Sequence, residues 1–502
     1  MNYRTHYHGR KLLTPQAYQK RAKQLAEAST MKPLPAFGGV SLPYASAVEN
    51  FLVFGVPGAG KSTLIDILMK SVLPGYVGTN ADHRALIHDH SGESVSVMYN
   101  LGFTFENGFL KTLNPFDRRS VAWDIAQDIT APSLARQFAR IIIPDNPKVT
   151  DPFWNNAARN ILAGVLISMN ERYPRQWNLR DVIQVCLFEE ESFLIELLGW
   201  SRINAPQVRL LSSPAEKMTS SILEVLRTVL TDYIEIAALW CYAKEKVTVS
   251  SFLQGSYVLL LGAYQTVQST LETVNRLFLA RLIDEILTSK HFAEDAFNPR
   301  RTWIIIDEGS KIGKVEGMLD LLDLGRKYGV STVFSYHDIS QVEEHYDDQH
   351  ESFLAKFGNK AFLRLEDVKT PKWASDFFGT SEFIHHDVST SENMSNNTFY
   401  DEPYGAFGNQ NIGKTLDESI RDAQLIPSNV FPSFPRVWET GTIKGCFSTC
   451  VGASLYTINS DYLHQHRIGK TAGVLTQDFY SLDEVVFPFW GEGLRSPYGV
   501  MH

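Results

Sequence analysis

The residues from Gly55 to Thr63 constrain the fold of this chain more than any other segment, because they read Gly-Val-Pro-Gly-Ala-Gly-Lys-Ser-Thr. A short apolar run, Phe51 to Phe54, precedes them, and a helical pattern, Leu64 to Leu68, follows. Glycines at this spacing let consecutive backbone N–H groups turn inward around a phosphate, a geometry that side chains would obstruct. The order of strand, glycine-rich loop and helix therefore predicts a P-loop in an α/β domain.

The end of this loop carries the side chains that a nucleoside triphosphate needs. We expect Lys61 to place its ammonium group on the β and γ phosphates, and Ser62 to offer its hydroxyl to Mg²⁺. The positive end of the following helix dipole points at the same anion. The sequence therefore predicts ATP and Mg²⁺ as cofactors. The residues expected to bind the nucleotide are Gly55, Gly58, Ala59, Gly60, Lys61, Ser62 and Thr63.

A second acidic site follows the apolar run Trp303 to Ile306, where the next two residues are Asp307 and Glu308. Phosphoryl transfer uses one carboxylate to hold magnesium and another to orient or deprotonate the attacking water. We expect Asp307 to take the metal role, together with Ser62, and Glu308 the catalytic role. The alternative is that both acids merely cap a helix, but their occurrence with a P-loop favours a Walker B motif and ATP hydrolysis.

Arg326 stands eighteen residues after Glu308, in the run Leu324-Gly325-Arg326-Lys327-Tyr328-Gly329. A guanidinium near the end of the helix after Walker B can cross a subunit boundary and stabilise charge on a transferring phosphoryl group. A surface salt bridge is the alternative. We predict that Arg326 is a catalytic residue supplied by a neighbouring subunit.

His337 follows the next candidate strand, Ser331 to Ser335. A polar side chain at the end of a strand beside Walker B can sense the γ-phosphate. It can equally be a core histidine with satisfied hydrogen bonds. The predicted catalytic set is Lys61, Glu308, Arg326 and His337.

Short apolar runs alternate with helical periodicity along most of the chain, which is typical of a parallel sheet with crossover helices. The candidate strands are Phe51–Phe54, Ala85–Asp89, Tyr257–Leu261, Trp303–Ile306, Ser331–Ser335 and Ala361–Leu365. From residue 151 to 246 the pattern is helical throughout. The predicted fold class is α/β, with a mainly parallel sheet and an inserted all-α domain.

Composition divides the rest of the chain. The expected segments are a basic N-terminal arm (1–35), two parts of a nucleotide-binding domain (36–150 and 247–380), an all-α insert (151–246), an acidic, flexible or meandering surface segment (381–420) and a C-terminal mixed region (421–502). Residues 1–32 carry seven Lys or Arg against one acid. This arm fits binding to a phosphate backbone, but it also fits a solvated amphipathic helix or docking to an acidic partner.

Bulk properties restrict the compartment and the surface. The formal net charge of −9 argues against a surface generally coated by nucleic acid. No stretch approaches the roughly 18 to 20 apolar residues of a membrane span, and the N-terminus lacks the apolar core of a signal peptide. The four cysteines are too few and too scattered for a disulfide framework. We therefore expect a cytoplasmic protein.

Taken together, the motifs resemble those of the TraD/TraG-like type IV coupling proteins, which are RecA-like P-loop ATPases of conjugation and type IV secretion. The resemblance runs from about residue 38 to 379, with a weaker tail to about 460. Besides the P-loop and Walker B residues, it is carried by Gly39-Val40-Ser41-Leu42-Pro43, Asp89 with Gly92-Glu93, Leu113-Asn114-Pro115-Phe116-Asp117, Ala122-Trp123-Asp124, Asp151-Pro152-Phe153-Trp154, Ala158-Arg159, Gly325-Arg326-Lys327, and Ser340-Gln341-Val342 leading to Tyr346.

The resemblance implies a RecA-like core plus an all-α domain, assembled as a homo-hexamer with ATP sites between subunits. It also implies DNA, bound without sequence preference, as the substrate, and a relaxase or type IV secretion components as partners. The family's N-terminal transmembrane helices are not visible here, so a cytoplasmic protein that docks peripherally at the inner membrane through a partner is expected. The family's Gln after the third motif strand falls on His337.

We therefore predict a DNA-translocating ATPase of the coupling-protein class. Two alternatives stay open. One is a coupling ATPase for protein effectors. The other is a nucleotide-gated DNA-binding or recruitment scaffold that hydrolyses ATP slowly.

Overall fold

The apolar runs of the sequence form a nine-stranded sheet in the computed structural model, which describes residues 3–74, 77, 83–145, 151–288, 301–393, 411–469 and 474–490. The strand order is β16-β15-β12-β4-β11-β10-β5-β9-β6. Their bounds are β4 (Phe51–Phe54), β5 (Arg84–His88), β6 (Leu110–Thr112), β9 (Val258–Leu261), β10 (Thr302–Ile306), β11 (Val330–Tyr336), β12 (Asn359–Phe362), β15 (Ile443–Thr449) and β16 (Gly452–Ile458).

The sheet is parallel from β12 to β6, and β15 and β16 continue it antiparallel at one edge. Each of the six predicted strand runs overlaps one of its strands, so the predicted α/β class with a mainly parallel sheet is confirmed. Its central strands are buried along their whole length because helices cover both faces. Alternate residues of one strand therefore face different cores: Phe51 and Val53 pack in one apolar cluster, Leu52 and Phe54 in the other.

Helices on the two faces hold the loops that follow the strands. The helices of this α/β part are α2 (Lys61–Val72), α3 (Ser94–Asn100), α12 (Val249–Gln254), α13 (Gln268–Thr288), α14 (Gly309–Ile312), α15 (Met318–Leu324), α16 (Ile339–Tyr346), α17 (His350–Ala355), α18 (Lys369–Phe378), α19 (Val437–Thr440) and α20 (Ser460–His466). α2 and α3 pack in the cluster of Phe51, and α13, α15 and α16 in the cluster of Leu52.

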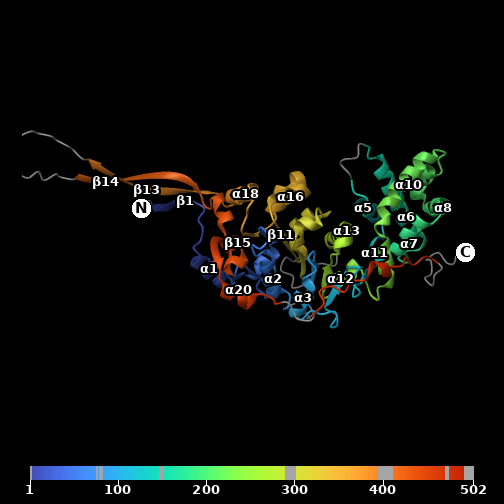
Figure 1. Cartoon of the computed structure of the whole chain (residues 1–502), viewed down its shortest axis with the longest axis horizontal. Coiled ribbons are helices and arrows are strands. Elements are labelled where there is room, and N and C mark those ends of the chain that lie inside the picture. Colours follow the sequence, from blue (N-terminus) through green and yellow to red (C-terminus); the bar gives the residue numbers. More distant parts are fainter. Residues whose placement is uncertain are drawn as a thin grey trace, which may run out of the picture.

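A helical region lies at the end of the molecule beyond α13 (Figure 1). Its elements are α4 (Ile125–Asp128), α5 (Pro132–Ile142), α6 (Phe153–Arg172), α7 (Leu179–Ile183), a π-helical turn (Gln184–Phe188), α8 (Glu191–Gly199), α9 (Ala205–Leu211), α10 (Glu216–Thr231) and α11 (Ile234–Tyr242). The long helix α6 is buried from Ala157 to Met169 except at Asn160, because α5, α8 and α10 pack around it. Two short strands, β7 (Ala122–Trp123) and β8 (Lys246–Val247), pair in parallel where the chain enters and leaves this region.

The acidic segment is more ordered than its composition predicts. Strands β13 (Thr380–Asn393) and β14 (Asn411–Gln424) pair along their full length as an antiparallel ribbon that projects from the α/β part (Figure 1). Residues 394–410, between them, lie outside the described residues. The Ser- and Asn-rich sequence indicates a flexible or meandering segment, whereas the described residues form two strands whose cross-strand hydrogen bonds satisfy the backbone.

The N-terminal arm is folded against the rest of the chain. Strand β1 (Tyr3–Gly9) adds to β13, and α1 (Pro15–Ala28) buries Tyr18, Ala22 and Ala26 near β16. The exposed face of α1 carries the basic residues Lys20, Arg21 and Lys23. A short pair, β2 (Ala36–Phe37) and β3 (Val40–Ser41), then leads into the sheet.

Residues 474–490, here called the C-terminal strap, extend from the α/β part to the helical region (Figure 1). Arg118 donates to Glu484 at 2.7 Å, and the Trp490 indole donates to Asp181 Oδ1 at 2.9 Å. The strap therefore contacts both the α/β part and the helical region, and in each case its partner is far from it in the sequence. Among the helices that the structure describes, none is long and apolar enough to cross a membrane.

Candidate nucleotide-binding site

The P-loop connects the carboxyl end of β4 to the first turn of α2, as the sequence predicts. Gly58 (φ 78°) and Gly60 (φ 104°) adopt left-handed backbone conformations that other residues rarely take. They are also crowded from outside the loop: a Cβ on Gly58 would lie 1.6 Å from the Trp438 ring, and one on Gly60 would lie 2.7 Å from Ile443. Conformation and close approach both require glycine at these two positions.

Lys61 lies at the centre of the site. Its ammonium group donates to the Gly55 carbonyl at 2.7 Å and lies 2.9 Å from Nδ1 of His337. Burial lowers the pKa of Lys61 to about 8, although the carboxylates of Asp307 and Glu308 act against this fall. The side chain is therefore a poorly solvated cation whose charge a phosphate would stabilise.

The predicted metal ligands are together. The Ser62 hydroxyl donates to Oδ2 of Asp307 at 2.8 Å, and Ser335 donates to the Asp307 carbonyl. Burial raises the pKa of Asp307, and the hydrogen bond from Ser62 opposes that rise. One hydroxyl and one carboxylate suit Mg²⁺, which keeps waters and phosphate oxygens as its other ligands. The residues present thus fit the predicted ion.

His337 joins Lys61 to Glu308. An ammonium group can only donate, so Nδ1 of His337 accepts from Lys61 and Nε2 carries the hydrogen that points to Glu308 Oε1, 3.5 Å away. The hydrogen bond from His337 lowers the pKa of Glu308, and partial burial opposes it. The backbone N–H of His337 donates to Gln341 Oε1 at 2.9 Å, which fixes the backbone of this residue. Its side chain is 27% exposed, so it is not a core histidine.

Arg326 lies at the amino ends of the parallel strands, opposite the ends that carry the P-loop. It belongs to the 3-10 turn Gly325–Tyr328 before β11, and its side chain is exposed. Glu49 lies at the same ends of the strands. Burial raises the pKa of Glu49, and the charge of Arg326 opposes that rise. The P-loop adjoins the other end of β11, where Gly55 N–H donates to Tyr336 O at 3.1 Å. At about 3.3 Å per residue, the ends of this strand are roughly 20 Å apart. One chain therefore brings together every predicted site residue except Arg326.

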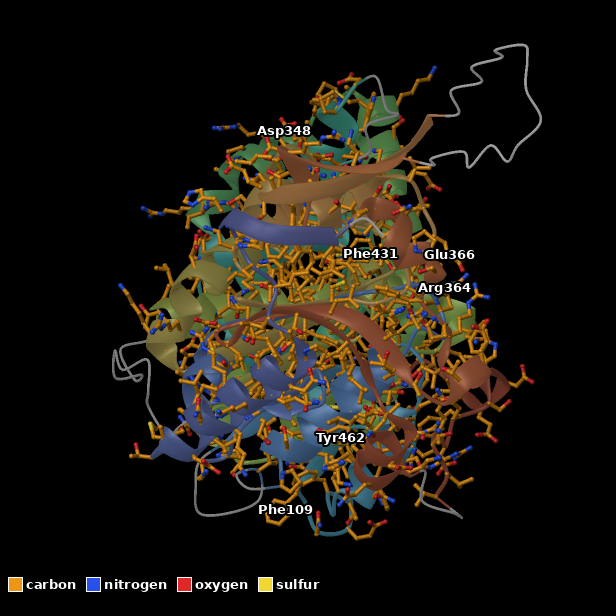
Figure 2. All side chains as sticks on the ribbon, turned by 90° about the vertical axis from the view of Figure 1, so that its left-hand side faces the viewer. Phe109, Asp348, Arg364, Glu366, Phe431 and Tyr462 are labelled. Carbon is orange, nitrogen blue, oxygen red and sulfur yellow. The ribbon has the colours of Figure 1, made fainter. Side chains whose placement is uncertain are left out.

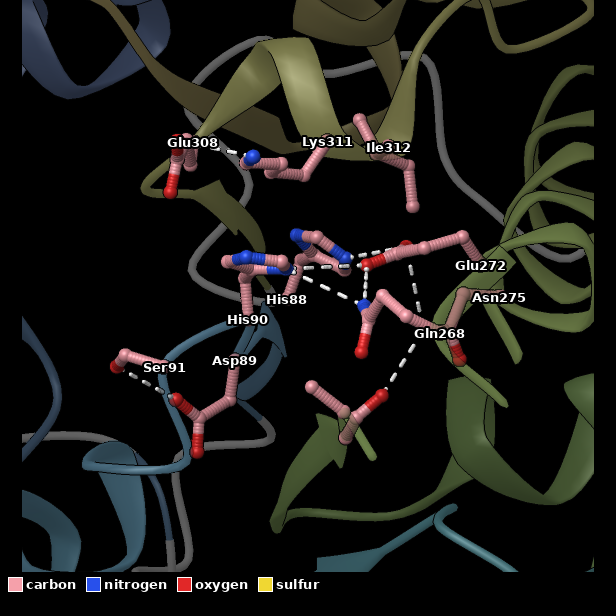
Figure 3. Close-up of polar contacts among 12 residues, drawn as sticks. His88, Asp89, His90, Ser91, Gln268, Glu272, Asn275, Glu308, Lys311 and Ile312 are labelled. Carbon is pink, nitrogen blue, oxygen red and sulfur yellow. Dashed lines mark hydrogen bonds and ion pairs between the residues drawn. The ribbon is translucent and has the colours of Figure 1, made fainter. Parts of the chain in front are cut away.

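A partly buried cluster of one acid and two histidines adjoins the Walker B residues and was not predicted. His88 ends β5 and pairs in register with Ile306, which places His90 beside Glu308. Glu272, from α13, lies 2.7 Å from His88 and 3.4 Å from His90, and Figure 3 shows it pointing toward both rings. Burial alone would raise the pKa of Glu272, but the hydrogen bonds from both histidines lower it to about 2. This cluster connects the helix α13 to the strand ends at the site.

The C-terminal region forms another wall of the site that sequence reasoning missed. A cavity of about 720 Å³ lies over the P-loop. Its lining residues are Pro57, Gly58, Gly60, Lys61, Ser62, Thr63, His337, Val437, Trp438, Gly441, Leu463, His464 and Arg467. No motif marks the last six of these, because their place depends on contacts with residues almost four hundred positions away in the sequence.

An ionic clamp fixes this wall to the loop. Glu366 accepts from Arg364 Nε at 2.6 Å and from Arg436 Nη2 at 2.8 Å, and the first pair is labelled at the surface in Figure 2. Arg364 also donates to the Phe434 carbonyl at 2.6 Å, and its own carbonyl accepts from Val56 N–H at 2.9 Å. The segment before α19 is therefore tied to the start of the P-loop.

The fold and the site define a RecA-like P-loop nucleotide-binding protein with an added helical region. A family model for the type IV secretion-system coupling protein DNA-binding domain matches residues 35–404, more than half of the chain. The chain therefore belongs to this family, and the resemblance in its motifs is confirmed.

Individual relatives agree with this membership. The coupling protein TraD of Escherichia coli (strain K12) is 27% identical over 350 residues, which cover 68% of this chain and 45% of TraD. The chain thus spans less than half of that relative. The structure of the plasmid coupling protein TrwB in complex with the ATP analogue ADPNP has a TM-score of 0.65 at 15% identity, covering 95% of this chain and 98% of TrwB. The unbound bacterial conjugative coupling protein TrwBdeltaN70 gives 0.64 at 17% identity, with 91% and 93% covered. Their fold is the fold of this chain.

Proposed function

We propose that this protein is an ATP-hydrolysing motor of the coupling-protein class, which moves DNA in conjugative transfer or type IV secretion. The observation that carries the proposal is the line of contacts Lys61–His337–Glu308, beside the pair Ser62–Asp307. It supplies one cation for the phosphates, one carboxylate for the attacking water and two oxygen ligands for a metal. A site that only binds nucleotide has no use for Glu308.

The chemistry follows from these residues. Lys61 neutralises charge on the β and γ phosphates, and the P-loop N–H groups hold them in place. Glu308, kept ionised by the hydrogen bond from His337, accepts the proton of the attacking water or orients that water. Mg²⁺, when held by Ser62 and Asp307, would neutralise further phosphate charge. Related structures support these cofactors, since TrwB is described in complex with ADP and Mg²⁺.

Assembly and partners belong to the same proposal. A homo-hexamer would place Arg326 of one subunit at the P-loop of the next, which agrees with its distance from its own site. DNA would be bound without sequence preference. A relaxase or type IV secretion components would be partners, and one of them would dock the protein peripherally at the inner membrane.

The test is the ATPase rate of the full chain alone, with single-stranded DNA and with duplex DNA, combined with displacement of a protein block bound to the DNA. We expect DNA to stimulate hydrolysis and the block to be displaced in one direction. Glu308→Gln should bind ATP and Mg²⁺ but should not hydrolyse ATP. Lys61→Ala should neither bind nor hydrolyse ATP.

Other outcomes would replace the proposal. ATP hydrolysis that DNA does not stimulate, without displacement, favours a coupling ATPase for protein effectors. DNA binding that depends on nucleotide but not on hydrolysis favours a recruitment scaffold. Turnover by Lys61→Ala near the wild-type rate would show that this P-loop is not the catalytic site.

A further inference from the structure

The nucleotide cavity has more room and more kinds of side chain than phosphate binding requires. Its P-loop side supplies backbone N–H groups, Lys61 and Ser62, all suited to phosphates. Its C-terminal side, from α19 and α20, instead supplies an indole, an imidazole, a guanidinium and aliphatic carbons. A flat aromatic surface with apolar neighbours suits a planar ring rather than a phosphate.

Trp438 is the flat surface, and the P-loop holds it in place. Its six-membered ring lies so close to the Cα atom of Gly58 that a Cβ there would be 1.6 Å from it. The backbone N–H of Val437 donates to the Gly58 carbonyl at 2.9 Å, and the guanidinium of Arg436 lies 5.3 Å from the centre of the Trp438 ring. The ring is therefore supported by the loop and by a cation.

The same side chain is nevertheless 66% exposed. Most of the indole is in contact with water, although the backbone of the preceding residue, Val437, is hydrogen-bonded to the P-loop, and this exposure has no benefit for folding. The exposed surface borders the cavity, together with His464 and Arg467 of the α20 region. The exposed face of the Trp438 indole is thus accessible to a ligand whose phosphates are bound by the P-loop.

The positions of the catalytic residues indicate which part of a bound nucleotide faces Trp438. Glu308 and His337 mark the end at which the γ-phosphate is cleaved. Trp438 and α20 belong to the C-terminal wall, which contains none of the catalytic residues. The base and ribose of a bound nucleotide therefore point toward Trp438.

We propose that Trp438 is the platform on which the base of the bound nucleotide stacks, held at the P-loop by the Arg364–Glu366–Arg436 clamp. This inference rests on the proposed nucleotide binding. Stacking uses the π-face that every base has, so the platform selects a nucleoside over bare phosphate without reading the base. Nucleotide binding would thereby also fix the C-terminal wall against the loop.

The experiment compares the affinities of the full chain for the Mg²⁺ complexes of a non-hydrolysable ATP analogue and of inorganic tripolyphosphate. Trp438→Ala should weaken binding of the analogue by about tenfold, the loss of one base stack, and leave tripolyphosphate within twofold. Trp438→Leu, which still covers Gly58 but has no π-face, should behave like the alanine variant. Trp438→Phe should keep most of the affinity. Tyr242→Ala, which removes a 52% exposed aromatic of the helical region, is the matched control.

Equal loss for both ligands in Trp438→Ala and in Trp438→Leu would show that the ring merely supports the loop, and would overturn the inference. Unchanged affinity for both ligands would overturn it as well. Both outcomes leave the P-loop intact, because the wild type still binds tripolyphosphate. A wild-type chain that binds neither ligand would instead remove the proposed function, and this inference with it.

Discussion

Lys61 shows how burial prepares one residue for its ligand. With its pKa lowered to about 8, the side chain is mostly protonated at neutral pH but loses its proton as the pH rises through 8. A bound triphosphate stabilises the charged form, so binding above pH 8 must take up a proton. The dissociation constant of a non-hydrolysable ATP analogue should therefore rise between pH 7.5 and 9.5, by at most about tenfold per unit.

Calorimetry in two buffers of different ionisation enthalpy measures this uptake directly. Lys61→Arg is the matched variant, because a guanidinium stays charged throughout this range. It should bind more weakly at pH 7.5, owing to its different shape, but with a flat pH profile. A wild-type profile that is equally flat would show that the lysine proton is not linked to binding.

His337 permits a second test at the residue scale, since its ring accepts from Lys61 and donates toward Glu308. A glutamine can do both through its amide, whereas alanine can do neither. His337→Ala should lower kcat by about tenfold to a hundredfold, because His337 only supports Glu308 and a general base itself contributes roughly 10²- to 10⁴-fold. His337→Gln should recover most of that loss. If both variants hydrolyse ATP as the wild type does, His337 is not part of the catalytic line.

At the element scale, the sequence predicts the strands and loops that a contiguous pattern of residues specifies. Parallel strands such as β4 and β10 are almost continuous apolar runs, so the sequence predicts their residues, and it also predicts Lys61 and Asp307 in the loops that follow them. The ribbon of β13 and β14 is rich in Ser, Asn and acidic residues, a composition that is typical of a loop. Trp438 and Glu272 reach the site through packing between distant segments, and neither lies in a recognisable pattern.

The link between β5 and α13 has a consequence for stability. Glu272 is buried, and its pKa falls from 4.5 to about 2 on folding, so the folded chain binds its proton less tightly than the unfolded chain. The stabilisation is complete above pH 4.5 and is lost as the pH falls toward 2. A shift of this size corresponds to on the order of 3 kcal/mol.

Urea unfolding between pH 6 and pH 3 measures this dependence. Glu272→Gln should lower the midpoint at pH 6 and flatten its fall at lower pH. Glu285→Gln, on the same helix but with a side chain that is 28% rather than 6% exposed, is the control and should keep the wild-type slope. Parallel curves for the wild type and Glu272→Gln would show that the His88–Glu272 pair does not carry the effect.

At the scale of the whole molecule, the catalytic residues and Arg326 lie at opposite ends of the parallel strands. The P-loop, Glu308 and His337 lie at the carboxyl ends of the parallel strands, and Arg326 lies at the other end of β11. If hydrolysis requires Arg326, a second subunit must place its own Arg326 at the site. Isolated monomers should then be poor ATPases, and activity should rise with protein concentration.

The decisive measurement mixes two inactive variants under assembly conditions. Arg326→Ala subunits keep the P-loop, Lys61→Ala subunits keep the arginine, and some interfaces of a mixed ring regain both, so partial activity should return. An arginine finger contributes roughly a thousandfold or more in rate, whereas a surface ion pair contributes only about 0 to 1 kcal/mol of stability. Lys327→Ala, which removes the neighbouring exposed charge, should stay active alone. Full activity of Arg326→Ala by itself would end the finger assignment. Two inactive variants that stay inactive at every mixing ratio would remove the support for action across subunits.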